Sequence, residues 1–209
     1  IFFLFFFVIG QTETKSQSEI ERKIFDEINA IRKDPQTYLP YLQEYKKYLN
    51  GKVIQFPNAV GLETFEGAVA IDDAINFLKN ATKLRPYKLS TGVSKPAKSQ
   101  LSDLLEKPSL GHFGKDGSNL PKRLSKFGAY GYYYAENITY SATSPRDIVL
   151  MMIIDDGNLH RGHRKNLFSK NFQEVGIAYG ISNDKRGISV TIFTDFFRES
   201  GSKGGLRRF

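Results

Sequence analysis

The 209-residue chain contains no cysteine and no tryptophan, and only three of its residues are histidine. Without thiols it can form no disulfide, present no cysteine nucleophile and build no thiolate zinc site. Hydrophobic residues make up 40% of the chain and charged residues 25%, the balance of a globular protein rather than a disordered one. A chain of this length can fill one core without covalent cross-links.

The sequence also has no apolar run long enough to cross a bilayer, which takes about 20 residues. Residues 1–9 read Ile-Phe-Phe-Leu-Phe-Phe-Phe-Val-Ile, and this length matches the apolar part of a secretory signal peptide. We therefore predict that residues 1–10 are the remainder of a signal segment, cut before Gln11, and that the protein is secreted, extracellular and not transmembrane. A buried N-terminal strand is the alternative, which the lack of alternation disfavours.

Acidic residues are fewer than basic ones, so the net charge is +8 and the sequence pI is about 9.5. Such a chain is attracted to anionic surfaces, although the charge also serves plain solubility. The basic residues are scattered, apart from Arg161, Arg164 and Lys165, so the composition does not indicate specific nucleic-acid binding. The basic, Gly-rich end, 199–209, is predicted to be a flexible tail.

Apolar residues recur with helical spacing early in the chain and alternate with other residues near its end. Ser18 and Glu21 form a capping box that predicts the start of a helix. The stretch Leu84–Ser99 is rich in Pro, Gly, Ser and Lys and predicts a loop. The other predicted elements are helices ending at Asp34, at Asn50 and at Ile154, helices over 66–80, 99–106 and 121–127, a Tyr-rich strand at 130–138, and a hairpin of 174–181 and 188–194 with one buried face.

Helices lead and strands close the chain, and neither an internal repeat nor a linker divides it. This order favours one α+β domain with helices stacked on a sheet, which we place at residues 18–198. Two of the three histidines, His160 and His163, lie in one short segment together with Asp155 and Asp156. Groups that bind a metal or move protons near neutral pH are therefore rare here and clustered. His160, alone in a polar turn, is assigned no role.

Three turn-like segments, around His112, Glu136 and His163, carry rare polar residues. Together with a helix motif near the start they give four cues, which in chain order are Ile28-Asn29-x-x-Arg32-x-x-Pro35, His112 followed by Asp116-Gly117-Ser118, the pair Glu136-Asn137, and Gly162-His163-Arg164-x-Asn166-Leu167. With these motifs the chain resembles the CAP superfamily. This superfamily comprises cysteine-rich secretory proteins, antigen 5 and plant pathogenesis-related proteins, and its domain is also called SCP. The cues span nearly all of Ser18–Phe197 and look like the microbial branch.

The resemblance implies a three-layer α-β-α sandwich with a central, mostly antiparallel sheet and a cleft lined by two histidines and two acids. In some relatives that cleft holds zinc or another divalent cation. Carried over by position, His112, Glu136 and His163 take three of these places. The family's usual Trp-x-x-Glu is absent, and Asp155 or Asp156 stands in the same region, so the fourth acid stays open between these two.

Neutral imidazole suits zinc, and nearby carboxylates complete or neutralise such a site. Each residue also has a purely structural interpretation. His112 would then bond across a tight loop, and Glu136 would tie the backbone at a strand end. His163 would anchor its turn, with Arg164 paired to Asp155 or Asp156.

The resemblance, and the lack of an identifiable nucleophile–base pair, favour a secreted, non-enzymatic binding module. Its cleft would hold a divalent cation, zinc or another, and its partner would be a lipid, a glycan or a protein. The alternative is a metal-dependent hydrolase, a protease or an esterase, in which Glu136 is general base to a bound water. A third interpretation is adhesion to an anionic surface through charge alone.

Overall fold

The structure, a computed structural model, describes residues 7–58 and 61–201. Its helices are α1 (Phe7–Lys33), α2 (Leu39–Lys47), α3 (Ala68–Asn80), α4 (Thr91–Glu106), α5 (Leu120–Phe127), α6 (Pro145–Ile154) and α7 (Gly162–Leu167), with 3₁₀ turns η1 (Pro35–Tyr38) and η2 (Pro108–Leu110). Its strands are β1 (Leu49–Asn50), β2 (Val53–Ile54), β3 (Leu62–Glu63), β4 (Lys88–Leu89), β5 (Gly128–Tyr130), β6 (Tyr134–Tyr140), β7 (Glu174–Ile181), β8 (Gly187–Thr194) and β9 (Phe197–Glu199).

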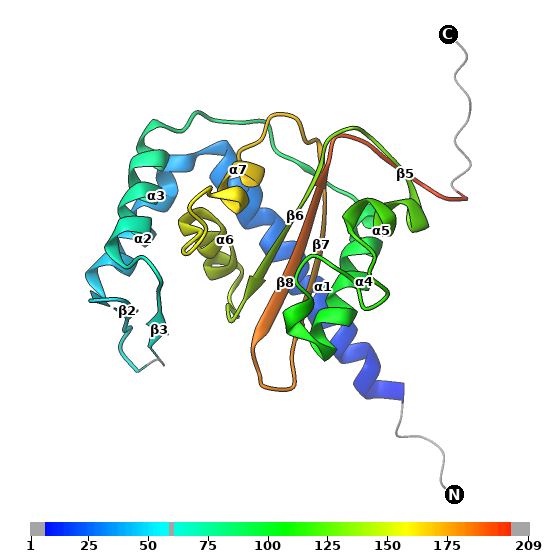
Figure 1. Cartoon of the computed structure of the whole chain (residues 1–209), viewed down its shortest axis with the longest axis horizontal. Helices are drawn as coiled ribbons and strands as arrows, with labels where there is room; N and C mark the ends of the chain where they lie inside the picture. The colour runs from blue at the N-terminus through cyan, green and yellow to red at the C-terminus, as the bar shows by residue number, and fades with distance from the viewer. Residues whose placement is uncertain (1–6, 59–60, 202–209) are drawn as a thin grey trace, which may run out of the picture.

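A central sheet with the strand order β4-β7-β8-β6 divides the molecule into layers (Figure 1). Its pairs are antiparallel except for the short parallel pair of β4 and β7. Helices α1, α3 and α6 pack in the core on one face, and α4 and α5 pack on the other. The predicted α+β class and the α-β-α sandwich with its mostly antiparallel sheet are therefore confirmed.

Both faces of the β7–β8 hairpin are buried, so the prediction of a single buried face is wrong. Every residue of β8 is buried, and β7 is buried from Val175 to Gly180. The small residues that alternate with Val175, Ile177 and Tyr179 face α4 rather than water. A Cβ added to Gly176 would lie 2.2 Å from the backbone carbon of Val93 in α4, so only glycine permits this close approach.

Helix α4 occupies much of the stretch Leu84–Ser99, which was predicted to be a loop. Ser90 caps its start, because the Ser90 hydroxyl accepts a hydrogen bond from the backbone N–H of Val93 at 3.4 Å. Pro96 lies inside the helix, where proline is unfavourable by about 3 kcal/mol. The helix forms nonetheless because it buries one apolar face on the sheet. The buried residues of that face include Val93, Pro96, Ala97, Leu101 and Leu104.

The start of α1 also differs from the prediction. The helix begins at Phe7, so Ser18 lies within it and the predicted start at Ser18 is wrong. No proline or glycine between residues 11 and 17 interrupts the helix. Glu21, rather than closing a capping box, accepts a hydrogen bond from the Tyr179 N–H at 3.3 Å. Residues 1–6 of the predicted signal segment and 202–209 of the predicted tail lie outside the described residues, and in the described part no helix is long and apolar enough to span a membrane.

Other boundaries shift by a few residues. The predicted helix that follows Asp34 begins as the 3₁₀ turn η1, and α2 ends at Lys47, before the short strand β1. The predicted Tyr-rich strand at 130–138 is two strands, β5 and β6, which belong to different sheets. Helix α3, helix α5 and helix α6 lie where they were predicted, and Ser144 caps α6 by accepting the Asp147 N–H at 3.1 Å.

Candidate functional site

Four of the five predicted site residues form two imidazole–carboxylate pairs beside strand β6. In the first, the Glu136 pair, His112 Nδ1 lies 2.9 Å from Glu136 Oε1. In the second, the Asp155 pair, His163 Nδ1 lies 3.0 Å from Asp155 Oδ1. The strand connects them, because Asn137, next to Glu136, donates its side-chain amide to the His163 carbonyl at 3.1 Å. The sequence motifs therefore meet at neighbouring positions of one strand.

The carboxylate of the Glu136 pair is neutralised by a buried arginine on α5. Arg123 NH2 lies 2.6 Å from Glu136 Oε2, and both side chains are at most 2% exposed. The same guanidinium donates to the carbonyls of His112 and Ser118, each at 3.0 Å. Arg123 thus holds the His112 loop and the strand together. Sequence reasoning missed it, although an arginine next to Leu124 on the apolar face of a short helix was an available signal.

The carboxylate of the Asp155 pair is held by backbone groups instead. Asp155 ends α6 in the left-handed conformation, with φ 52°, which an aspartate tolerates better than most residues. Its Oδ2 accepts the backbone N–H of His163 at 2.8 Å and that of Arg164 at 3.4 Å. Burial alone would raise the pKa of Asp155, but the hydrogen bonds and charge of His163 outweigh it and lower that pKa.

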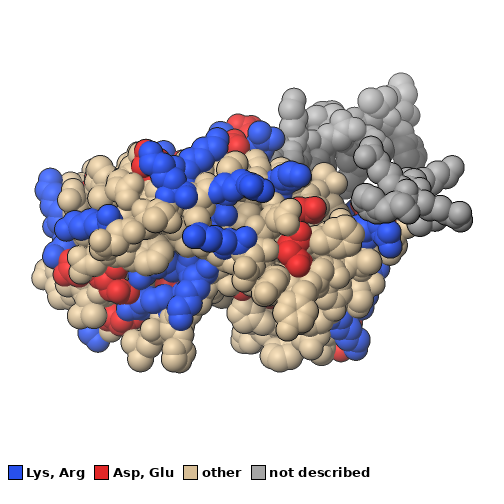
Figure 2. Space-filling view, turned by 90° about the horizontal axis from the view of Figure 1, so that it is seen from above, with Lys and Arg blue, Asp and Glu red and all other residues tan. Residues whose placement is uncertain are grey.

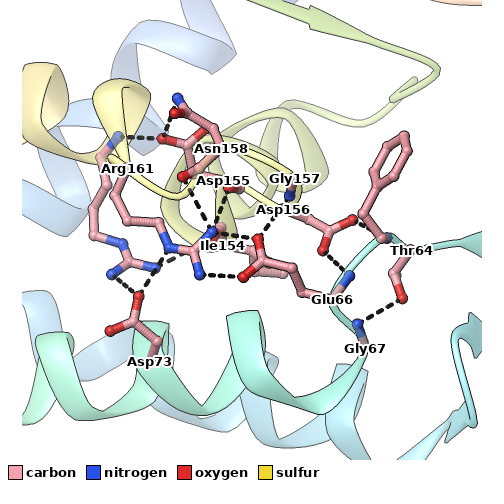
Figure 3. A network of polar contacts seen from close by, with 12 residues as sticks. Thr64, Glu66, Gly67, Asp73, Ile154, Asp155, Asp156, Gly157, Asn158 and Arg161 are labelled. Carbon is pink, nitrogen blue, oxygen red and sulfur yellow. Dashed lines mark hydrogen bonds and ion pairs between the residues drawn. The ribbon is translucent and has the colours of Figure 1, made fainter.

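Asp156 bonds to a different segment of the chain. Its two carboxylate oxygens accept the backbone N–H groups of Phe65 and Glu66, at 2.6 and 2.9 Å (Figure 3). Asp155 is therefore the acid that pairs with a histidine, whereas Asp156 fastens the segment after β3 to the end of α6. The sequence left the choice between these two aspartates open.

Arg161 is the centre of the network that surrounds this turn (Figure 3). Its guanidinium forms a bidentate pair with Glu66, at 2.6 and 2.7 Å, and its Nε lies 3.0 Å from Asp73 Oδ2. The hydrogen bonds from Arg161 lower the pKa of Glu66. Arg161 itself has a left-handed backbone, with φ 50°, an uncommon conformation outside glycine that surrounding contacts must hold in place.

Arg164 does not pair with Asp155 or Asp156, so that structural interpretation is wrong. Its NH1 lies 2.9 Å from Asp73 Oδ2, and its other nitrogens donate to the carbonyls of Ile153 and Ile154. The reason is that backbone N–H groups and His163 already occupy the two aspartates. Glu66 and Asp73, which complete the network, come from distant segments, and no motif in the sequence marked them.

A cavity of about 440 Å³ adjoins the Asp155 pair. It lies along β6, which is an edge strand of the central sheet, and between the end of α6 and the β2–β3 hairpin. Its polar lining residues include His163, Asp155, Asp156, Asn158 and Thr139. Most of the rest is apolar, and includes Ile54, Leu62, Ile138, Met151 and Ile154. His112 and Glu136 do not line it.

The carboxylates fit a metal ion poorly as direct ligands, because protein donors already occupy their oxygens. Among residues 7–58 and 61–201, no group of three or more His, Cys, Asp and Glu side chains is arranged to hold a metal. The imidazoles fit better. Each directs Nδ1 at a buried carboxylate, the arrangement that orients metal-binding histidines, and this leaves Nε2 of His112 and of His163 as the donors.

Comparison with solved structures finds several similar proteins. Among solved structures, an outer surface protein from Borrelia burgdorferi has 16% identity and a TM-score of 0.47, and the match covers 61% of this chain and 89% of that chain. An extracellular protein with an SCP domain from Bacillus anthracis has 18% identity and a TM-score of 0.42, over 62% of this chain and 39% of that chain. A cysteine-rich secretory protein from Staphylococcus aureus has 17% identity and a TM-score of 0.40, over 75% and 49%.

A search of curated protein sequences finds no significant match. The model of the cysteine-rich secretory protein family, CAP, matches residues 25–194, which is most of the chain. That range contains all the motifs on which the sequence resemblance depends, from the Asn29 helix to the His163 turn, and both imidazole–carboxylate pairs. The chain therefore belongs to the CAP family of cysteine-rich secretory proteins.

Proposed function

We propose that the protein is a binding module whose cavity beside His163 takes a small amphipathic molecule of the lipid class. The observation that carries this proposal is the lining of the cavity. Apolar residues share the lining with an oriented imidazole and a buried hydroxyl that has no partner among the described residues. Ligand sites in proteins share this composition, a mostly apolar surface with a few placed polar groups.

The hydroxyl belongs to Thr139, which is 6% exposed and lines the cavity. Its Oγ1 has no hydrogen-bond partner among the described residues. A buried polar atom without a partner is unfavourable by about 1–3 kcal/mol, so a rotation of the Thr139 side chain that brings Oγ1 to a ligand head group would recover that energy. His163, which is fixed by Asp155, offers a second polar contact at the same cavity.

Binding of the fluorescent fatty acid dansyl-undecanoic acid, measured by titration, tests the proposal. We expect wild type to bind the probe, and Met151→Trp, which fills the cavity, to abolish binding. Thr139→Val should weaken binding while leaving the fold intact. Val69→Trp is the matched control, because Val69 is 66% exposed and outside the cavity lining. Equal binding by wild type and Met151→Trp would sink the proposal.

A divalent cation is a second candidate ligand, supported by the carboxylate-held orientation of both imidazoles. The donors would be the two Nε2 atoms, with zinc the metal that imidazole suits. We expect equilibrium dialysis to show that wild type and the control variant His160→Ala take up zinc. The double variant His112→Ala/His163→Ala should take up none. Equal uptake by all three proteins would remove the cation from the proposal.

A hydrolase with Glu136 as general base is less well supported by the geometry. Both oxygens of that carboxylate are engaged, by His112 and by Arg123, and the side chain is 2% exposed. In the described part of the chain, no hydroxyl donates to His163 in the manner of a nucleophile–base pair. We expect wild type to turn over neither peptide nor ester substrates when zinc is added. Hydrolysis by wild type that is lost in Glu136→Gln would instead support a hydrolase.

Export is part of the proposal and depends on the apolar stretch of residues 1–9. The protein isolated from its source is expected to begin at Gln11, which N-terminal sequencing would show. A mature protein that retains residues 1–10 would contradict a cleaved signal.

A further inference from the structure

A second cavity, of about 450 Å³, has no histidine in its lining and lies where the ends of several elements meet. Its walls are the end of α1, the segment between α3 and β4, and the turn between α7 and β7. All of its charged lining residues are basic. They are Arg32, Lys83, Arg85, Lys88 and Lys170. We call this cavity the anion pocket.

The segment between α3 and β4, which supplies several residues of the anion pocket, runs along the top of the molecule (Figure 1). Seen from above, Lys and Arg side chains gather over the middle of the face in view (Figure 2). Arg85, Lys88 and Lys170 are exposed, and none of them forms an ion pair with a carboxylate in the described part of the chain. Lys83, by contrast, forms an exposed ion pair with Asp34, at 3.2 Å.

Arg32 adds a buried positive charge to the anion pocket. It is 2% exposed, and its guanidinium donates to the carbonyls of Arg85, Leu167 and Ser169 at 2.5–3.1 Å. It also stacks over the Tyr87 ring, with 3.6 Å from Cζ to the ring centroid. Within residues 7–58 and 61–201 no carboxylate pairs with it.

A buried charge without a counter-ion is unusual, because burial in protein is unfavourable for an unpaired ion. Carbonyl dipoles and the tyrosine ring stabilise the Arg32 guanidinium but leave its net charge unneutralised. The charge therefore adds to the field of Lys83, Arg85, Lys88 and Lys170 inside a concave surface, where fields are focused. Glu174, the register neighbour of Lys88 in the sheet, does not line the anion pocket.

We propose that the anion pocket binds a phosphate group, with Arg32 at its base and Arg85, Lys88 and Lys170 around its opening. Guanidinium and ammonium groups together match the charge and the acceptors of a phosphate. The group could belong to free phosphate or to a phospholipid head group, and the chemistry at the protein is the same. This site is separate from the cavity beside His163 and does not depend on the function proposed there.

Titration with inorganic phosphate, followed by NMR, tests the proposal. The ionic strength is held at about 0.15 M, because exposed charges are then screened beyond about 8 Å and diffuse attraction by net charge is suppressed. We expect saturable binding with shifts centred on residues 83–88 and 170–173. Lys88→Gln/Lys170→Gln should weaken binding by about tenfold or more, because hydrogen bonds to charged groups are lost. The matched control is Lys107→Gln/Lys122→Gln, which removes the same charge outside the anion pocket. It should bind like wild type.

Sedimentation with phosphatidylcholine vesicles that contain phosphatidic acid distinguishes the two sources. Vesicle binding that free phosphate displaces assigns a lipid head group, and binding of free phosphate alone assigns the soluble anion. Either result supports the proposal if the Lys88→Gln/Lys170→Gln variant loses it and the control keeps it. An equal loss in both variants would show diffuse attraction by net charge, and the absence of any saturable binding to wild type would likewise overturn the proposal.

Discussion

His112 and His163 each direct Nδ1 at a buried carboxylate, at 2.9 and 3.0 Å, but the two carboxylates are balanced by different groups. Glu136 faces the buried guanidinium of Arg123 at 2.6 Å. Asp155 accepts backbone N–H groups of the turn that it closes. The histidines also differ, since the His112 side chain is 56% exposed and that of His163 is 25% exposed.

This difference separates two ways of keeping a carboxylate charged inside a protein. An ion pair does so with a partner from another element, so removal of either member leaves a charge unpaired. Backbone donors do so within one turn, so the carboxylate and the turn conformation depend on each other. The Glu136 pair therefore connects layers of the fold, whereas the Asp155 pair shapes a wall of the cavity.

The largest expected effect is that of Arg123→Met. It leaves Glu136 buried without its cation, so we expect a loss of about 3–5 kcal/mol in the free energy of unfolding. Urea denaturation measures it, and Lys122→Met, an exposed position of the same helix, is the control. If Arg123→Met/Glu136→Gln regains most of the loss, the ion pair is the cause. A loss below about 1 kcal/mol in Arg123→Met would mean that the two pairs do not differ as described.

Asp155→Asn should have a smaller effect, about 1–2 kcal/mol near neutral pH, because hydrogen bonds to a charged acceptor weaken. The pKa of Asp155 is lower in the folded protein than its usual value. Its contribution is therefore fully present above about pH 4, and it is lost as the pH falls through the lowered folded pKa.

The free energy of unfolding, measured from neutral pH down to the pH of acid denaturation, should thus decline less steeply in Asp155→Asn than in wild type. The control is Asp26→Asn, an exposed carboxylate on α1. Parallel curves for wild type and Asp155→Asn would show that Asp155 carries none of the acid sensitivity.

Glu66→Gln should weaken the network around the Asp155 pair by about 1 kcal/mol, because glutamine keeps the shape of the carboxylate but loses the charge of the bidentate contact with Arg161. Because that contact fastens the segment after β3, the effect should be local. We expect faster hydrogen exchange at residues 61–66 with the sheet unchanged. Glu63→Gln, an exposed neighbour, is the control, and uniform acceleration across the molecule would contradict a local role.

The smallest effect is expected for His112→Ala, about 0.5 kcal/mol or less, because more than half of that side chain is exposed and Arg123 still neutralises Glu136. His163→Ala should lose more, since His163 lines the cavity and bonds to Asp155. Thermal unfolding of the two variants side by side measures the contrast. A larger loss for His112→Ala would reverse the comparison.

Much of the fold could be predicted from local patterns. The helix over 68–80, the capped start at Ser144 and the β7–β8 hairpin follow from periodicity and turn chemistry. The start of α4 could not, because its proline and glycine favour a loop until the sheet supplies a surface on which to bury Val93 and Ala97. Local preference was overridden there by tertiary packing.

The candidate site was predictable only where a motif carried it. The motifs identified His112, Glu136, His163 and the two aspartates, and the structure shows that Asp155 is the one paired with a histidine. Arg123, Glu66 and Asp73 were missed because their roles arise from contacts between segments that are distant in sequence. A single sequence records such contacts in no local pattern.

Three arginines, Arg32, Arg123 and Arg164, are almost completely buried, and each guanidinium bonds to backbone carbonyls outside its own helix. In a family named for its cysteines, these side chains cross-link the sandwich by contacts that form and break reversibly. The polypeptide should therefore regain its native state from denaturant in the presence of reductant, with no oxidase or isomerase to guide it.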